Sequence, residues 1–122
     1  MRLTTELRDR TKAFASAVIR FYIQLPKERE EVSVLGHQFL RAGTSVASHA
    51  REASRARSDS EFCSKLDVLL QEADETQLWL ELLRDDCGII GPKTESLIAE
   101  AGEILAIFTT IVSRTRRRGS GD

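Results

Sequence analysis

The sequence predicts an all-α protein, an up-down-up-down antiparallel four-helix bundle. Apolar residues recur at alternating spacings of four and three along four separate stretches, which is typical of helices with one buried face. Proline occurs twice and glycine seven times among 122 residues, so few positions interrupt a helix. Short connections separate the stretches, and short connections make consecutive helices antiparallel neighbours.

The first helix is expected over residues 5–25. Thr4 or Thr5 suits its N-terminus, because a hydroxyl oxygen there accepts a hydrogen bond from a free backbone N–H. Pro26 ends it, because proline disfavours helical geometry at the preceding residue. Its apolar seam consists of Leu7, Thr11, Phe14, Val18, Phe21 and Leu25.

The second helix is expected over residues 32–54. Beside its seam, Gly36 and Gly43 lie seven residues apart on one face. Glycine costs a helix interior about 1 kcal/mol relative to alanine, so we expect a neighbouring backbone to come close at these glycines. The seam consists of Val32, Leu35, Phe39, Ala42, Val46, His49 and Ala53.

The third helix, over residues 60–87, carries the strongest pattern. Its seam continues for about six turns without glycine or proline. Ser58 or Ser60 is suited to cap its start, and Gly88 is expected just beyond its end. The seam consists of Phe62, Leu66, Leu69, Ala73, Thr76, Leu80 and Leu83.

The fourth helix is expected over residues 92–116, with Pro92 in its first turn. The arginines near its end suit a helix C-terminus, where the macrodipole favours cations. We therefore place the bundle in residues 1–118 and a flexible tail in residues 119–122. The seam consists of Leu97, Ala101, Ile104, Phe108 and Ile111.

Additional apolar stripes beside the seams exceed what one four-helix core requires. They indicate self-association, in which the surplus surface would be buried; the alternative is a wide core within a single protomer. The surplus residues are Leu70, Leu78, Leu82, Ile98, Leu105 and Val112.

Composition indicates one soluble domain, with 41% hydrophobic and 30% charged residues and a formal net charge of −1. No uncharged run approaches the roughly 20 residues of a membrane span, and the charged N-terminus does not resemble a secretory signal. We therefore expect a cytoplasmic protein that does not bind membranes. Cys63 and Cys87 would lie roughly 36 Å apart on one helix, too far for a disulfide.

The sequence predicts neither enzymatic activity nor a metal or cofactor. The Glu-x-x-His motif of di-iron bundles is absent. Ser45 and His49 are spaced as neighbours on a helix, but no acid is placed to orient the histidine as a catalytic triad requires. We expect a local hydrogen bond there, and a partner carboxylate for His49 on another helix, such as Glu72 or Glu75.

Two arginine clusters form the candidate nucleic-acid-binding site. One lies near the connection between the second and third helices, and the other near the C-terminus. In an up-down bundle both belong to the same end, whereas residues 67–86 are acidic. Such cations bind phosphates without reading sequence. The candidate residues are Arg51, Arg55, Arg57, Arg114, Arg116, Arg117 and Arg118.

Two segments resemble the bacterial four-helix bundle protein family, whose members include proteins encoded in intervening sequences of large ribosomal RNA genes. In the second helix, His49 and Ala53 replace the asparagine and glycine of the family pattern. The matching residues of the second helix are Gln38, Arg41, Ala42, Ser45, Val46 and Glu52. Those of the third helix are Glu72, Ala73, Glu75, Thr76, Trp79 and Leu80.

The resemblance implies an up-down bundle that forms a homopentameric ring. Most family members have no assigned biochemical function. A related, strongly basic branch serves diversity-generating retroelements by binding nucleic acid and a reverse transcriptase; the present chain lacks that basic character. The resemblance and the seams together predict that Trp79 is buried or nearly so, with Glu75 and Thr76 contacting the second helix near Ser45 and His49.

The predicted function is that of a non-enzymatic, homo-oligomeric assembly or scaffold module. The alternative is a nucleic-acid-binding accessory protein, for example of a retroelement reverse transcriptase.

Overall fold

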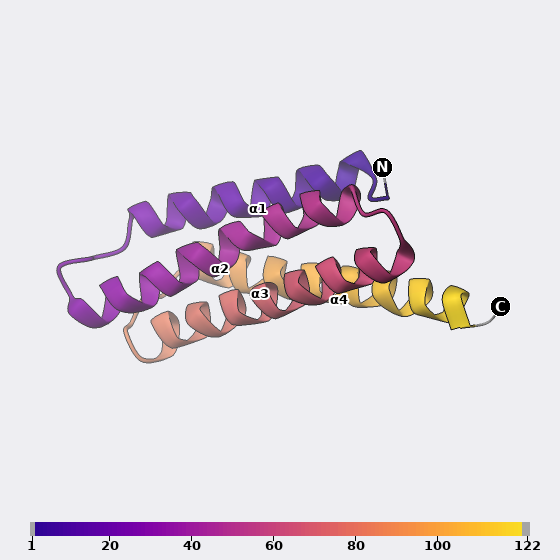
Figure 1. Ribbon diagram of the computed structural model, residues 1–122. Coiled ribbons are helices and arrows are strands. Elements are labelled where there is room, and N and C mark those ends of the chain that lie inside the picture. Colours follow the sequence, from indigo (N-terminus) through magenta and orange to yellow (C-terminus); the bar gives the residue numbers. More distant parts are fainter. Residues whose placement is uncertain (1, 121–122) are drawn as a thin grey trace.

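The structure, a computed structural model, describes residues 2–120. In that range it contains four α-helices and no strand: α1 (Thr5–Ile23), α2 (Glu30–Ser54), α3 (Asp59–Asp85) and α4 (Pro92–Ser120). In Figure 1, α1 and α3 run away from the end that holds the N-terminus, and α2 and α4 return to it. The predicted all-α, up-down-up-down antiparallel bundle is confirmed.

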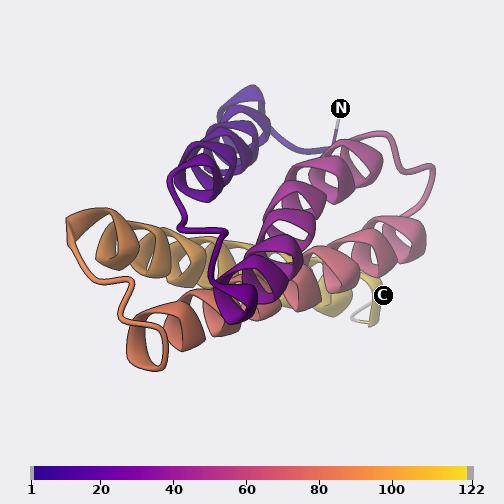
Figure 2. The ribbon, with the colours of Figure 1, turned by 90° about the vertical axis from the view of Figure 1, so that its left-hand side faces the viewer.

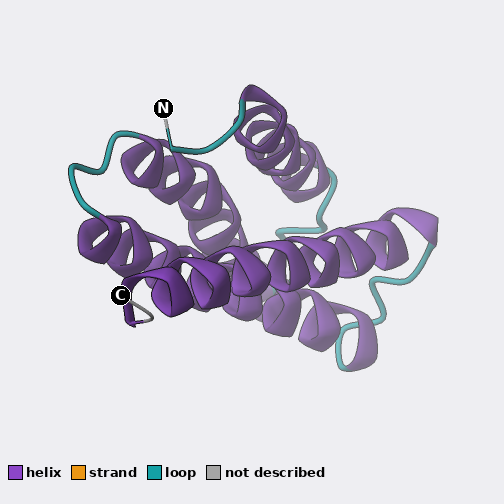
Figure 3. Cartoon of the chain, turned by 90° about the vertical axis from the view of Figure 1, so that its right-hand side faces the viewer, coloured by secondary structure: helices purple, strands orange, loops and turns teal. Residues whose placement is uncertain are grey.

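The four helices do not contact one another equally. α2 packs on both α1 and α3, and α3 packs on α4, whereas α1 and α4 meet over a shorter stretch. Figure 2 shows α1 standing away from α4. Figure 1 shows the connecting loops at the two ends of the bundle, and Figure 3 shows the helices and loops from the end that holds the N-terminus. Between α1 and α4, Arg10 donates two hydrogen bonds of 2.8 Å to the Glu100 carboxylate. These bonds raise the pKa of Arg10.

Most residues of the predicted seams form the core, whereas Leu7, Leu35 and His49 are only half-buried. Phe21 of α1 and Phe39 of α2 pack edge to face, with ring centroids 5.4 Å apart. On α4 the seam is displaced by one residue at its end, because Val112 is buried and Ile111 is only half-buried. The largest fully buried side chains include Phe14, Phe39, Phe108, Leu66, Leu69, Leu80, Leu83 and Ile104.

The helix ends follow the predicted capping residues. The Thr4 hydroxyl accepts from the N–H of Leu7 at 3.2 Å, and the Ser58 hydroxyl accepts from the N–H of Glu61 at 3.0 Å. Gly88 follows α3 with a φ of 74°, a conformation that favours glycine. These side chains and the glycine define where α1 and α3 begin and where α3 stops.

Four helix boundaries differ from the prediction by two residues or more: α2 begins at Glu30 rather than at residue 32, α3 ends at Asp85 rather than at residue 87, and the ends of α1 and α4 differ as well. α1 ends at Ile23 rather than near residue 25, and the Lys27 ammonium donates to the carbonyl of Tyr22 at 2.9 Å and to that of Ile23 at 3.2 Å. α4 continues to Ser120, so Gly119 and Ser120 extend the helix instead of starting a tail. The remainder of the predicted tail, residues 121–122, lies outside the described residues.

Gly36 and Gly43 mark a close approach, but to side chains rather than to a neighbouring backbone. A Cβ added at Gly43 would lie 2.7 Å from both γ-carbons of Val18 in α1, and one at Gly36 would lie 3.0 Å from the Cδ1 of Leu25 in the loop after α1. The absence of two β-carbons therefore lets these branched side chains pack directly on the α2 backbone.

The surplus apolar residues have three different outcomes. Val112 belongs to the core of the protomer, whereas Leu78 is 46% exposed. The other four are half-buried.

By length and mean hydropathy alone (1.5 over 18 residues), α4 would also suit a membrane span, with 28% of that window buried in the protomer. The core helices of soluble proteins can pass the same test, so this composition establishes no membrane contact.

Candidate functional site

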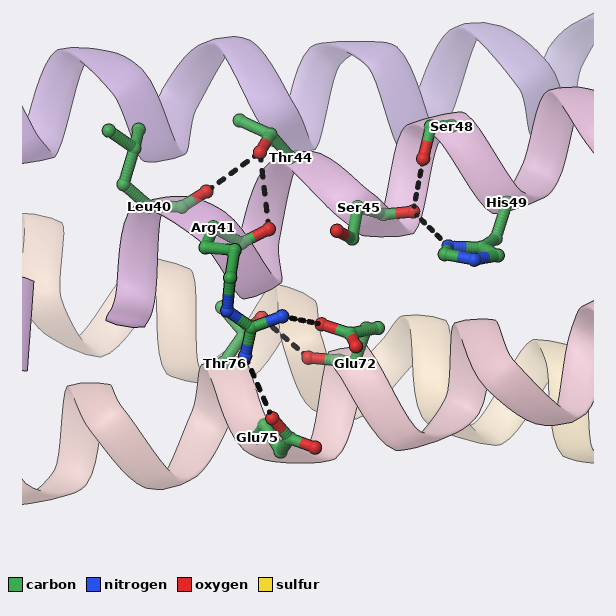
Figure 4. Close-up of polar contacts among 9 residues, drawn as sticks. All are labelled: Leu40, Arg41, Thr44, Ser45, Ser48, His49, Glu72, Glu75 and Thr76. Atoms are coloured by element: carbon green, nitrogen blue, oxygen red, sulfur yellow. Dashed lines mark hydrogen bonds and ion pairs between the residues drawn. The ribbon is translucent and has the colours of Figure 1, made fainter. Parts of the chain in front are cut away.

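The motif residues of α2 and α3 line one face, where the two helices pack against each other. Arg41 reaches from α2 to α3 and forms ion pairs with Glu72 at 3.3 Å and Glu75 at 3.2 Å (Figure 4). The Glu72 side chain is 14% exposed, whereas Arg41 and Glu75 are about half exposed (52% and 43%). Such a bridge fixes the register of the two helices more than it adds stability, since exposed pairs contribute about 0–1 kcal/mol.

His49 does not pair with Glu72 or Glu75, contrary to the prediction. Its Nδ1 lies 2.8 Å from the Ser45 carbonyl oxygen, which also accepts from the Ser48 hydroxyl (Figure 4). A carbonyl oxygen only accepts, so Nδ1 carries the proton. Both carboxylates already form ion pairs with Arg41, so neither is left to pair with His49. The predicted local hydrogen bond between Ser45 and His49 is present.

The other contacts of His49 and its neighbour Glu52 are longer. Glu52 lies 3.8 Å from the Nε2 of His49 and 3.8 Å from the Lys65 ammonium of α3. Glu75 contacts α2, as predicted, but its partner there is Arg41. Arg41 lies one helical turn before Ser45 and two turns before His49, the residues near which the contact was predicted.

Thr76 and Trp79 complete this face. Thr76 is fully buried, and its hydroxyl donates to the Glu72 carbonyl at 2.6 Å within α3, so it makes no polar contact with α2. Trp79 is half-buried, and its indole Nε1 is enclosed without a hydrogen-bond partner among residues 2–120. Gln38 is exposed on α2.

The two arginine clusters lie at the same end of the bundle, as the topology predicted. Figure 1 shows the α2–α3 connection and the C-terminal end of α4 at the end that holds the N-terminus. The side chain of Arg57 is 90% exposed and lies 3.6 Å from Glu61. Exposed cations at this end also include Arg51, Arg55, Arg114 and Arg118.

Two arginines of the tail cluster are already engaged. Arg116 pairs with Asp67 of α3 at 2.6 Å, and this hydrogen bond raises the pKa of Arg116. Arg117 donates to the Ser113 hydroxyl at 3.2 Å. The cluster therefore combines exposed cations with arginines that hold the end of α4 in place.

Sequence reasoning missed Arg2, which joins the same end. It pairs with Asp59 at 2.6 Å, donates to the Ala56 carbonyl at 2.9 Å and lies over the Phe62 ring. A lone arginine next to the first methionine carries no spacing signal, so only the fold places it here.

In residues 2–120, no three His, Cys, Asp or Glu side chains gather as metal ligands.

Comparisons with known proteins agree with this architecture. The model of the 23S rRNA-intervening sequence protein family matches residues 4–110. A crystal structure of a protein of unknown function from the S23 ribosomal protein family of Bacteroides thetaiotaomicron is similar, with a TM-score of 0.78 and 33% sequence identity. The alignment covers 86% of this chain and 96% of that one. No curated protein sequence matches the chain significantly.

Proposed function

Because the chain belongs to the 23S rRNA-intervening sequence protein family, we propose that it acts as a non-enzymatic, homo-oligomeric helical bundle, an assembly or scaffold module of the cytoplasm. The proposed assembly is a homopentameric ring, which the resemblance of its motifs implies.

The observation that carries this proposal is the apolar surface that α3 and α4 leave outside the core. Leu78 is 46% exposed, and only 28% of the apolar window of α4 is buried in the protomer. Gln77 donates to the Ile98 carbonyl at 3.1 Å, so the stripes of the two helices adjoin. Each Å² of apolar surface removed from water contributes roughly 25 cal/mol. We call this surface the α3–α4 stripe: Leu70, Leu78, Ile98 and Leu105.

Light scattering after size exclusion tests the assembly. The parent should show a mass of about five times the 13.7 kDa of one chain. Leu78→Glu should shift the mass towards one chain, because a charge in an apolar interface loses hydration without gaining a partner. Ile90→Glu is the matched control, since Ile90 is 77% exposed in the loop after α3. A parent of 13.7 kDa at micromolar concentration would contradict the proposal.

A second candidate function, a nucleic-acid-binding accessory protein such as one serving a reverse transcriptase, is supported by the common end of the two arginine clusters. In a ring each cluster would be repeated, so that weak contacts would act together through avidity. The test compares the parent with a variant carrying glutamine at positions 114, 116, 117 and 118. If the second candidate is correct, the parent should bind single- and double-stranded probes at low salt and the variant should bind them less tightly.

A further inference from the structure

A polar groove follows the line where α1 packs on α2, near the end that holds the N-terminus. It consists of three adjoining cavities. The first (about 300 Å³) and the second (about 220 Å³) share Arg8 and Arg51, and the second and third share Ser54 and Arg55. Because neighbouring cavities share lining residues, they form one continuous depression, which we call the α1–α2 groove.

The lining of the α1–α2 groove is strongly basic. The cations are Arg2, Arg8, Lys12, Arg51 and Arg55, against the single carboxylate of Asp9. Among the described residues, Lys12, Arg51 and Arg55 form no ion pair, and Arg8 donates only to the Thr5 hydroxyl at 2.8 Å. Arg41, Arg84 and Arg116 on other faces are paired with carboxylates. Arg2 is likewise paired with Asp59, so the positive charge that is left for an external anion is that of Arg8, Lys12, Arg51 and Arg55.

The spacing of these cations suits an extended anion better than a small one. Arg8 and Lys12 lie one helical turn apart on α1, with a rise of roughly 6 Å between them. Arg51 lies in the last turn of α2 and Arg55 is the residue at its C-cap, and together they form a second row of cations. The α2 side of the groove runs from Thr44 to Ser54, or about 15 Å, and Arg55 and Ala56 continue it beyond the helix end. At about 3.4 Å per nucleotide the helical part alone holds roughly four nucleotides of one strand.

Ser54 provides an observation that is independent of charge. It is 3% exposed, it lines the second and third cavities, and its Oγ is buried without a hydrogen-bond partner in the part of the chain that the structure describes. Buried hydroxyls are normally hydrogen-bonded, and each exception calls for a reason. A phosphate oxygen in the groove would accept from this hydroxyl.

We propose that the α1–α2 groove binds the sugar–phosphate backbone of a nucleic-acid strand. Arg8 and Lys12 form one row of phosphate contacts, Arg51 and Arg55 form the other, and Ser54 donates to a phosphate oxygen between them. This inference rests on the second candidate function and extends it to α1, which contributed no residue to the arginine clusters. No aromatic side chain lines the three cavities, so binding is indifferent to base sequence.

The test is a titration of the full chain with a fluorescent single-stranded RNA of ten nucleotides, repeated from 25 to 200 mM salt. The decisive variant is Arg8→Gln with Lys12→Gln. The control is Arg20→Gln with Lys93→Gln, which removes the same charge from a cavity at the other end of the bundle. The groove variant should bind at least about tenfold more weakly at 25 mM salt, and its log–log salt slope should fall by about 1.4. The control should keep most of the parent affinity.

The outcomes separate this inference from the candidate function on which it rests. If the parent binds no probe, both are overturned. If the groove variant binds like the control while the glutamine variant of positions 114, 116, 117 and 118 loses affinity, the groove is overturned and the arginine clusters remain. Competition by polyglutamate as effective as that by unlabelled RNA, at equal charge, would make the groove a general anion site and overturn its assignment to nucleic acid.

Ser54→Ala separates binding from folding. If the hydroxyl contacts phosphate, affinity should fall severalfold while the unfolding midpoint without ligand stays the same or rises, because an unpartnered buried hydroxyl is removed. Unchanged affinity, or a parallel loss of stability and affinity, would remove Ser54 from the site.

Discussion

At the scale of single residues, the packing of α1 on α2 depends on a glycine, which has no side chain, as well as on the apolar side chains around it. Gly43 lets the branched Val18 side chain, which is fully buried, rest on the α2 backbone. A helix-interior glycine costs about 1 kcal/mol relative to alanine. The close packing at Val18 offsets that cost.

Gly43→Ala should therefore destabilise the protein by about 1–3 kcal/mol, because overpacking outweighs the gain in helix propensity. Gly102→Ala is the control, since its added Cβ would meet only the Gln77 amide nitrogen, at 3.3 Å. That side-chain end can move, so this variant should be neutral or slightly more stable. Urea unfolding measures the free energy of unfolding of both variants. A Gly43→Ala protein as stable as the parent would show that α1 moves aside easily.

Trp79 has an indole N–H that is buried without a hydrogen-bond partner among the described residues. Leaving such a group unpaired costs about 1–3 kcal/mol, so Trp79→Phe should be at least as stable as the parent in urea unfolding. Trp79→Ala should be less stable, because the half-buried ring surface is lost along with the N–H. A clear loss of stability in Trp79→Phe would mean that the N–H is bonded in the folded protein, for instance across a contact between chains.

At the scale of elements, caps set the helix ends and α2 connects the two sides of the bundle. α2 packs on both α1 and α3. On its α3 side it carries the Arg41 bridge to Glu72 and Glu75, and on its α1 side it carries Arg51 of the groove, with Arg55 at its C-cap. One helix thus presents a neutralised face to α3 and an unpaired basic face beside α1.

Ser58→Ala should lower stability by about 1 kcal/mol, because the N–H of Glu61 loses its side-chain acceptor at the start of α3. Ser60→Ala is the control, as Ser60 is exposed in the first turn of the same helix. Thermal unfolding followed by circular dichroism compares the two. Equal melting temperatures for both variants would show that the cap contributes nothing.

At the scale of the whole molecule, charge and apolar surface occupy different places. The basic side chains lie at the N-terminal end and in the α1–α2 groove, whereas the α3–α4 stripe is apolar. A ring built through α3 and α4 would therefore leave the basic groove of every copy accessible. The proposed scaffold function and the second candidate function are compatible in one assembly.

If copies associate through the α3–α4 stripe, the melting temperature of the parent should rise with protein concentration, because association stabilises only the folded chain. The Leu78→Glu variant should melt at a lower temperature that is independent of concentration. Differential scanning calorimetry between 5 and 500 μM measures this. A parent melting temperature that does not change over that range would argue against association by folded chains.

The sequence by itself determined the number, order and direction of the helices and most of the core. Apolar residues spaced alternately four and three apart determine which face of a helix is buried. Short connections make consecutive helices antiparallel neighbours, which leaves few possible topologies. Caps such as Thr4 and Ser58 were readable because they act within one turn. The common end of the arginine clusters followed from the same topology.

The tertiary structure alone decided which side chains meet across helices. Arg41 takes both carboxylates that seemed available to His49, and Val112 rather than Ile111 joins the core. The α1–α2 groove was likewise invisible, because Arg8 and Lys12 lie far in sequence from Arg51 and Arg55 and no periodicity links them. Periodicity states which face is buried, whereas the rotation and offset of one helix against the next depend on the packing of particular side chains, such as Val18 on Gly43.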